Sequence, residues 1–388
     1  MSRLRLAKLS CAQLLELAVD ACESSPELKN KADALIAKVA PLPLWCVDVL
    51  LSPDLLPQLF SSFGLSEHAA AGVCTTWSHA YSRQLRRCRY VDPRRVRELA
   101  DVPTGPAGLC MLPGGVLAIT AHNDSHPGVY FVAARSDSDP QALAVCRSSS
   151  LAARRFGWLR GMAHTNDGLL VCSYNDPSTA LHKFAKDGSM DELATVPALA
   201  DYDQGFKKCA LHQQTQRTYA IAGEAGEENH ALVLLDTSLQ VVATVEATGG
   251  VPDDFDPIRD VAVHGDQVIV LTSGHHAKGS GLRLLDLDGQ YLRTIAAGQL
   301  QNPWVVAASH GRAFVIDDNE EDEDDNGPGK VLLVIDIQSG DIIQRVRVDL
   351  GGGSLRWASA MLVDGNDIYI GGYGNGGVVV LQLAGSEA

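Results

Sequence analysis

A pattern of short apolar segments separated by tight turns repeats along most of the chain. The second segment of each repeat begins near Val116, Leu169, Thr218, Val268, Ala313 and Ile368, at steps of 53, 49, 50, 45 and 55 residues. Apolar runs of this length bounded by Gly, Asp and Asn predict β-strands. A small meander cannot bury both of its faces alone, so each repeat must be covered by its neighbours.

The repeat is most regular between Ile258 and Asp317, where turns such as His264-Gly265-Asp266 and Asp288-Gly289 separate four strand-like runs. Six units at this spacing predict a six-bladed β-propeller over residues 93–385. The last unit ends near Leu383 after three strands. We expect Val96–Ala100, ahead of the first blade, to supply the missing fourth strand, which would close the ring and remove its open edge.

Residues 1–92 have a different pattern. Ser25-Pro26 and Ser52-Pro53 are typical helix starts, and Trp77, Tyr81 and Leu85 recur at helical spacing. The sequence therefore predicts a mainly β protein, in which a small all-α N-terminal domain precedes the propeller.

Part of this helical region resembles an F-box, at about residues 44–87. The resemblance rests on the run Leu51–Phe60, LSPDLLPQLF, and on Ala71–Trp77, AGVCTTW. It implies docking on the Skp-type adaptor of a cullin-type ubiquitin ligase. The contacts carried over are Pro53, Leu55, Leu56, Leu59, Val73, Cys74 and Trp77. Ser52-Pro53 stands where many F-boxes have Leu-Pro, and Glu67–Ala71 is rich in alanine. The alternative is that these residues form the interior of a helical cap.

The propeller repeats are similar to NHL repeats. In that family an apolar strand, an Asp-containing turn and a second apolar strand are followed by a strand ending in Asp-x-x-Gly. Asp260–Val270 and Gly281–Leu292 carry the resemblance, which covers residues 96–383, clearly in the second half and weakly in blades one and three. Neither the Trp-Asp strand end nor the Gly-His blade start of WD40 repeats is present. The resemblance implies an NHL-like propeller.

Composition narrows the classes of partner. The formal net charge of −15 disfavours nucleic acid and anionic membranes as partners. Nine cysteines without a C-x-x-C pair indicate reduced thiols and a cytoplasmic or nuclear location. No signal peptide or membrane-spanning segment is expected, and we expect a monomer.

Histidine recurs at one position of the repeat. His164, His212, His264 and His310 end the first strands of blades two to five, and Asp364 is at the same place in blade six. If these side chains converged on the channel axis, they could bind a divalent metal, as in lactonase-like or lyase-like propellers. The alternative is that each histidine hydrogen-bonds within its turn. We favour it because a residue that recurs at one position of a repeat protein is usually part of the repeat structure itself.

The loops between second and third strands should share one face of the disc. Their polar residues form a candidate partner-binding face: His122, Asp124, Asn175, Asp176, Glu224, His275, His276, Asp317, Tyr373 and Asn375. The acidic run Asp317–Asp325 is expected to be solvated and does not match an EF-hand.

No catalytic residues or cofactor are expected. The hypothesis is a protein-interaction adaptor that joins a ubiquitin ligase to a substrate protein held by the propeller. Two alternatives stay open: an NHL-propeller scaffold with no ligase role, and a metal-dependent propeller hydrolase or lyase.

Overall fold

The structure is a computed structural model. It describes residues 90–99, 102, 105–121, 128–134, 158–174, 179–185, 191–199, 205–223, 230–246, 257–273, 280–317, 331–347, 357–373 and 377–384. All of them belong to the second of the two compact units into which the chain divides, Phe60–Ala388. The predicted helical domain, and the F-box-like residues within it, lie outside these ranges.

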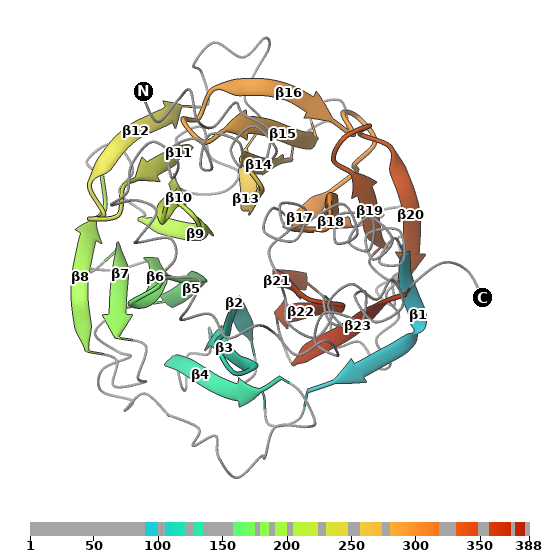
Figure 1. Ribbon diagram of the computed structural model, residues 1–388, viewed down its shortest axis with the longest axis horizontal. Helices are drawn as coiled ribbons and strands as arrows, with labels where there is room; N and C mark the ends of the chain where they lie inside the picture. Colours follow the sequence, from blue (N-terminus) through green and yellow to red (C-terminus); the bar gives the residue numbers. More distant parts are fainter. Residues whose placement is uncertain are drawn as a thin grey trace, which may run out of the picture. The chain divides into compact units, whose positions relative to one another are not determined.

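Six antiparallel sheets are arranged in a ring about a central axis, as in a six-bladed propeller (Figure 1). Blade one contains β2 (Pro106–Leu112), β3 (Val116–Ala121) and β4 (Gly128–Ala133). Blade two contains β5 (Trp158–His164), β6 (Gly168–Tyr174), β7 (Ala180–Ala185) and β8 (Glu192–Pro197). Blade three contains β9 (Phe206–His212), β10 (Arg217–Gly223), β11 (His230–Leu235) and β12 (Val241–Glu246).

The other three blades have the same meander order. Blade four contains β13 (Ile258–His264), β14 (Gln267–Thr272), β15 (Gly281–Asp286) and β16 (Tyr291–Ile295). Blade five contains β17 (Pro303–Ser309), β18 (Arg312–Asp317), β19 (Val331–Asp336) and β20 (Ile342–Arg347). Blade six contains β21 (Trp357–Asp364), β22 (Asp367–Tyr373) and β23 (Val378–Ala384). The second strands begin within one residue of the positions expected from the repeat.

The ring is closed by a strand from the other end of the sequence. β1 (Tyr90–Glu98) pairs antiparallel with β23, and Val96, Arg97 and Glu98 lie opposite Leu381, Val380 and Val379. β1 thus serves as the outer strand of blade six (Figure 1). β1 therefore pairs with the edge of β23, which would otherwise expose unpaired backbone N–H and C=O groups.

Aspartates at equivalent positions of three blades set the turn between the third and fourth strands. The carboxylate of Asp236 accepts hydrogen bonds from the backbone N–H groups of Ser238 and Gln240, each at 2.9 Å. Asp286 and Asp336 bond the backbone of their own turns in a similar way. Asp favours such turns because its short side chain can replace a backbone acceptor. In these three blades, the turn after the third strand is therefore held by an aspartate at the end of that strand or directly after it.

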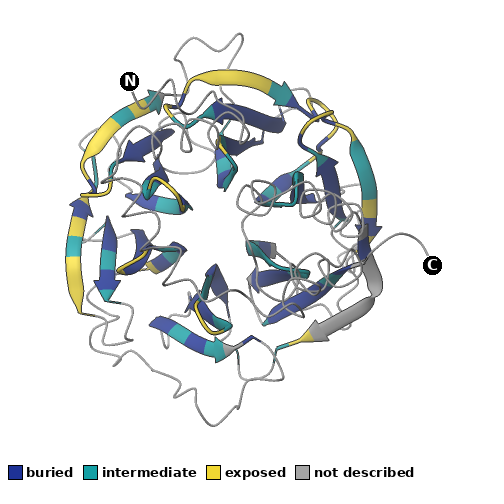
Figure 2. Cartoon of the chain, in the orientation of Figure 1, coloured by how far each residue is buried: buried dark blue, intermediate teal, exposed yellow. Residues whose placement is uncertain are grey.

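The core is divided into six apolar clusters, one at each interface between adjacent blades. The inner strands are buried and the outer strands β8, β12 and β16 are largely exposed (Figure 2). Burial between blades, rather than within one, is what a repeat with two apolar faces requires. Within the described ranges, the structure has no helix with the length and apolar character needed to span a bilayer.

Candidate functional site: the central channel

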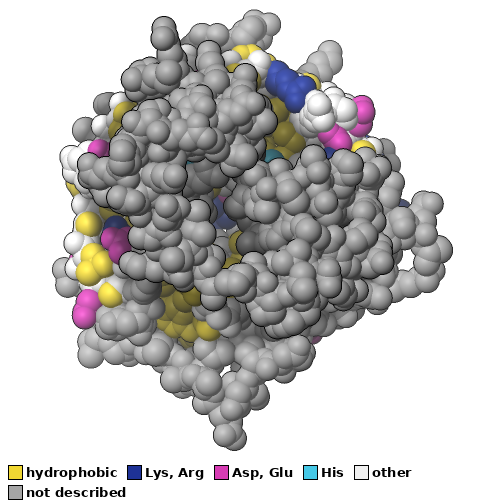
Figure 3. All heavy atoms as spheres, in the orientation of Figure 1, with side chains coloured by type: hydrophobic (Ala, Val, Ile, Leu, Met, Phe, Trp, Pro, Cys, Tyr) yellow, Lys and Arg dark blue, Asp and Glu magenta, His cyan; other side chains and the backbone are white. Residues whose placement is uncertain are grey.

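The first strands of all six blades line a central cavity of about 430 Å³. Small residues make room where neighbouring first strands approach each other. A Cβ on Gly161 of β5 would lie 2.7 Å from the Lys208 Cα of β9, and one on Gly108 of β2 would lie 2.4 Å from the Arg160 carbonyl oxygen. In the view of Figure 3, a Lys or Arg side chain is visible near the middle of the molecule.

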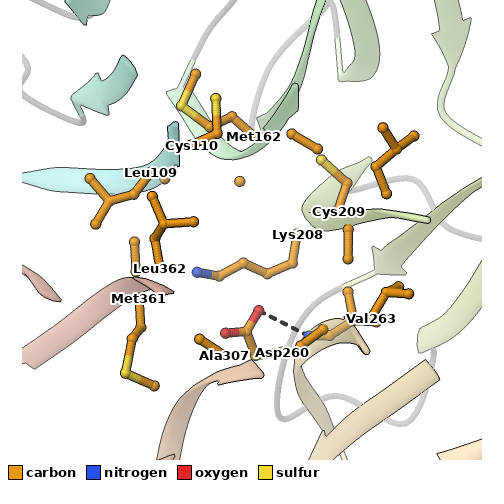
Figure 4. Close-up of a pocket in the computed structure, with 18 of the residues that line it drawn as sticks. Leu109, Cys110, Met162, Lys208, Cys209, Asp260, Val263, Ala307, Met361 and Leu362 are labelled. Atoms are coloured by element: carbon orange, nitrogen blue, oxygen red, sulfur yellow. Dashed lines mark hydrogen bonds between the residues drawn. The ribbon is translucent and has the colours of Figure 1, made fainter. Parts of the chain in front are cut away.

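Three charged residues, Lys208, Asp260 and Asp364, line this channel together with apolar side chains and polar backbone groups. Lys208 extends from β9 across the channel, and its ammonium donates a hydrogen bond to the carbonyl of Ser359 on β21, in the opposite blade (Figure 4). Asp260 of β13 is 6% exposed. Its Oδ1 accepts from the Val261 N–H and its Oδ2 from the Val306 N–H of the next blade, both at 2.9 Å. Asp260 therefore joins the first strands of blades four and five.

Burial raises the pKa of the Asp260 carboxyl above its ordinary value of 3.8, against the opposing effects of the Lys208 charge and the two N–H donors. The folded protein then keeps this proton to a higher pH than the unfolded chain does. The stabilisation that this group contributes is therefore complete below the pKa of the unfolded chain, and it is lost as the pH rises through the folded pKa.

We expect the free energy of unfolding of the native protein, minus that of Asp260→Asn, to be largest below the ordinary pKa of an aspartate, about 4, and to fall as pH rises. Asparagine does not titrate, so it removes this pH dependence while keeping one oxygen acceptor. Urea denaturation of both proteins across the pH range measures the difference. A difference that grew with pH would contradict the assignment.

Cations gather beside the channel on three consecutive blades. Arg160 of β5 and Lys207 of β9 lie over the ring of Tyr174, at 5.6 and 4.7 Å from its centroid. Arg259 of β13 lies 5.4 Å from the ring centroid of Trp304 on the next blade. Aromatic faces attract cations, so these rings hold the three charges in place. With Lys208, they make the first strands of blades two to four locally basic in an acidic protein.

The repeated histidines contact neighbouring turns. The His264 Nε2 accepts from the Gly311 N–H of the next blade at 3.1 Å, and the His310 Nε2 donates to the Gly365 carbonyl at 3.0 Å. The His212 Nδ1 lies 2.8 Å from the Thr215 hydroxyl. His310 lies in the turn itself, one residue after β17 ends.

No group of three or more His, Cys, Asp or Glu in the described ranges is arranged to hold a metal. His164 ends β5, and the carbonyl of this residue accepts from the Gln213 side chain of blade three. The side chains of His212, His264 and His310 thus hydrogen-bond to groups in turns.

The candidate partner-binding face is only partly described. Asp317 does not face a partner: it is buried, and its carboxylate accepts from the N–H groups of Gln301 and Asn302. Tyr373 ends β22. Eight further members lie outside the described residues: His122, Asp124, Asn175, Asp176, Glu224, His275, His276 and Asn375. So do Pro53, Leu55, Leu56, Leu59, Val73, Cys74 and Trp77 of the F-box-like motif.

A Ser–His–Glu series connects β6, β7 and β8 of blade two. The Ser173 hydroxyl is 3.0 Å from the His182 Nε2, and the His182 Nδ1 is 2.7 Å from a Glu192 oxygen. Ser173 is fully buried and hydrogen-bonds both backbone groups of Ala180. A nucleophile must reach its substrate. The series therefore ties three strands together and supplies no exposed nucleophile.

The described cysteines agree with the expectation of buried thiols. Cys110, Cys172 and Cys209 are free and buried. Burial raises the pKa of the Cys110 and Cys172 thiols, which keeps them protonated and poorly nucleophilic.

Lys208 and Asp260 are absent from the candidate site residues that the sequence indicates. A signal is nevertheless present, because Lys207-Lys208 and Arg259-Asp260 introduce charges at the starts of strands that are otherwise small and apolar. The apolar pattern predicts strands that begin after these pairs, at Cys209 and Val261, and it therefore assigns the charges to the preceding loops.

Comparison with known proteins identifies the fold and no family. No family model matches the chain, and no curated protein matches it. A protein of unknown function from Bacteroides thetaiotaomicron shares 9% identity over 75% of this chain and 73% of its own, with a TM-score of 0.50.

Two other solved structures fall below that score. A chain of a nidogen/laminin complex has 11% identity and a TM-score of 0.44, covering 62% of this chain and 80% of its own. Virginiamycin B lyase from Staphylococcus aureus has 11% identity and a TM-score of 0.44, covering 74% and 98%. At these scores neither structure supports a conclusion about this chain, and the likeness to the Bacteroides thetaiotaomicron protein extends to the fold alone.

Proposed function

We propose that the chain is a protein-interaction adaptor whose propeller holds a protein partner. A propeller scaffold fits a protein-binding role, because the closed ring gives a rigid platform for contact surfaces. The observation that carries the proposal is a repeated apolar position on the outer strands. The second residues of β8, β12 and β16 are Leu193, Val242 and Leu292, which are 54%, 56% and 48% exposed.

These three side chains, the outer apolar row, occupy the same strand position on three consecutive blades. The matching residue of blade five, Ile343, instead packs on the cluster between blades five and six. Apolar side chains exposed together in one patch are typical of contact surfaces for other proteins. The row supports a protein partner along the rim of blades two to four.

The finer proposal is that the N-terminal segment connects this scaffold to a cullin-type ubiquitin ligase in the cytoplasm or nucleus. Its support is the F-box-like sequence at residues 44–87, with the anchors Leu55 and Trp77. The metal-dependent hydrolase or lyase is the weaker alternative, because the described histidines bond to turns. A scaffold with no ligase role is the other alternative.

Binding of a purified Skp-type adaptor to the full-length chain tests the ligase role. We expect Leu55→Ala/Trp77→Ala to weaken binding at least about a hundredfold, because the double substitution removes two anchor side chains from the core of a single interface. Affinity is measured by calorimetry. Leu14→Ala/Leu17→Ala, outside the motif, is the matched control and should bind as the native chain does.

Circular dichroism must show that both variants remain folded. If the native chain does not bind the adaptor, the ligase role is wrong, and the chain is a scaffold without it. Equal loss of affinity in the control variant would also refute the proposed contacts.

A further inference from the structure

The ammonium of Lys208 has more hydrogen-bonding capacity than the protein uses. Its bond to the Ser359 carbonyl is the one that the described part of the chain provides, and a lysine has three N–H donors. Asp260 is close enough to Lys208 for their charges to interact, but both oxygens of Asp260 already accept hydrogen bonds from backbone N–H groups. A cation in a confined, partly apolar space favours an anionic partner that accepts the remaining bonds.

The walls around Lys208 determine what else a ligand must have. Leu109, Met111, Met162, Met361 and Leu362 line the cavity, together with small residues of the other blades. Figure 4 shows the lysine chain extending among these groups. Methionine adapts its shape to apolar ligands, and a volume of about 430 Å³ lies within the range of small-molecule sites. The cavity thus fits an apolar body.

The charges beside the channel favour approach by an anion. The cations Arg160, Lys207 and Arg259 belong to first strands that line the channel, β5, β9 and β13. Each of them is next to a lining residue in the sequence. The net charge of −15 would repel an anion elsewhere on the chain. Local cations of this kind raise the concentration of anions at a cleft and their rate of association.

A carboxylate fits better than a phosphate. Phosphate groups are usually bound by guanidinium forks or by several N–H groups at a helix N-terminus. Among the described lining residues, Lys208 is the one cationic side chain. One ammonium with two remaining donors matches a single carboxylate.

We propose that the central channel binds a small organic carboxylate, with its carboxylate on Lys208 and its apolar chain along the Met- and Leu-lined wall. This site is separate from the proposed protein-binding rim, and it stands whether or not the chain contacts a ligase.

Calorimetry with octanoate, octan-1-ol and inorganic phosphate tests the site on the full-length chain. We expect octanoate to bind the native protein and Lys208→Met to weaken it about ten- to a hundredfold, because a charge-assisted contact is lost. Lys183→Met, which removes a cation of β7 outside the channel lining, should leave octanoate binding unchanged. Octan-1-ol should bind the native chain and Lys208→Met equally.

A second variant keeps the lysine and fills the cavity. Ala307→Phe, on the channel wall, should abolish octanoate binding while Lys208 remains. Thermal unfolding without ligand shows whether each variant is folded. Absence of octanoate binding to the native protein, equal binding to Lys208→Met, or phosphate binding that displaces octanoate would each overturn the proposal.

Discussion

Leu381→Asp is expected to prevent folding of the propeller, or to lower its free energy of unfolding by more than about 4 kcal/mol. Leu381 lies in β23, between Val96 of β1 and Ile368 of β22, and is 1% exposed. Its side chain belongs to the cluster between blades five and six. A carboxylate at this position would lose its hydration in an apolar environment, at the seam that closes the ring.

The matched control is the same substitution on the surface. Leu193 is 54% exposed on β8, so Leu193→Asp should change the free energy of unfolding by no more than about 0.5 kcal/mol. Urea denaturation followed by circular dichroism measures both variants. If Leu381→Asp were no less stable than Leu193→Asp, the burial of Leu381 between blades five and six would be wrong.

Tyr219→Ala is expected to lower the free energy of unfolding by about 3–5 kcal/mol, because it leaves a large cavity between two blades. Tyr219 lies in β10 and is fully buried in the cluster between blades three and four. Its hydroxyl donates to the Leu287 carbonyl of blade four at 2.8 Å. The side chain therefore contributes both apolar packing and one polar contact across the interface.

Tyr219→Phe separates these two contributions. It removes the hydroxyl alone, and Arg217 still donates to the Leu287 carbonyl at 3.0 Å. We expect a loss of about 1 kcal/mol or less. Thermal and urea unfolding of both variants checks the order. A Phe variant as unstable as the Ala variant would show that the hydrogen bond, rather than packing, dominates this interface.

The repeat could be predicted because its signals are local. Gly, Asp and Asn mark turns wherever they occur, and β-branched runs predict strands without knowledge of their neighbours. Asp286 illustrates this, since the bonds of its carboxylate reach only Asp288 and Gln290 in the same turn. The pairing of residues 96–98 with β23 also followed from a local observation, a last unit that lacked its fourth strand.

The candidate site was harder to predict because it depends on which strands meet. The histidines were recognised by their spacing, but their partners, such as Gly311 and Gly365, belong to the next blade. Asp317 is the first residue of the acidic run, yet its carboxylate bonds the chain 15 and 16 residues earlier. The spacing of the repeats in the sequence does not predict such contacts.

The six repeats, the positions of their strands and the strand that closes the ring follow from the sequence alone, because local propensity and a regular period specify them. The tertiary fold was needed to show that Lys208 crosses the channel to Ser359, 151 residues later, and that Asp260 joins blade four to blade five. A charged residue in a strand has the same local preferences whether it faces solvent or a channel. Closure of the ring brings six distant strands together, and this fixes which charges are buried and what they contact.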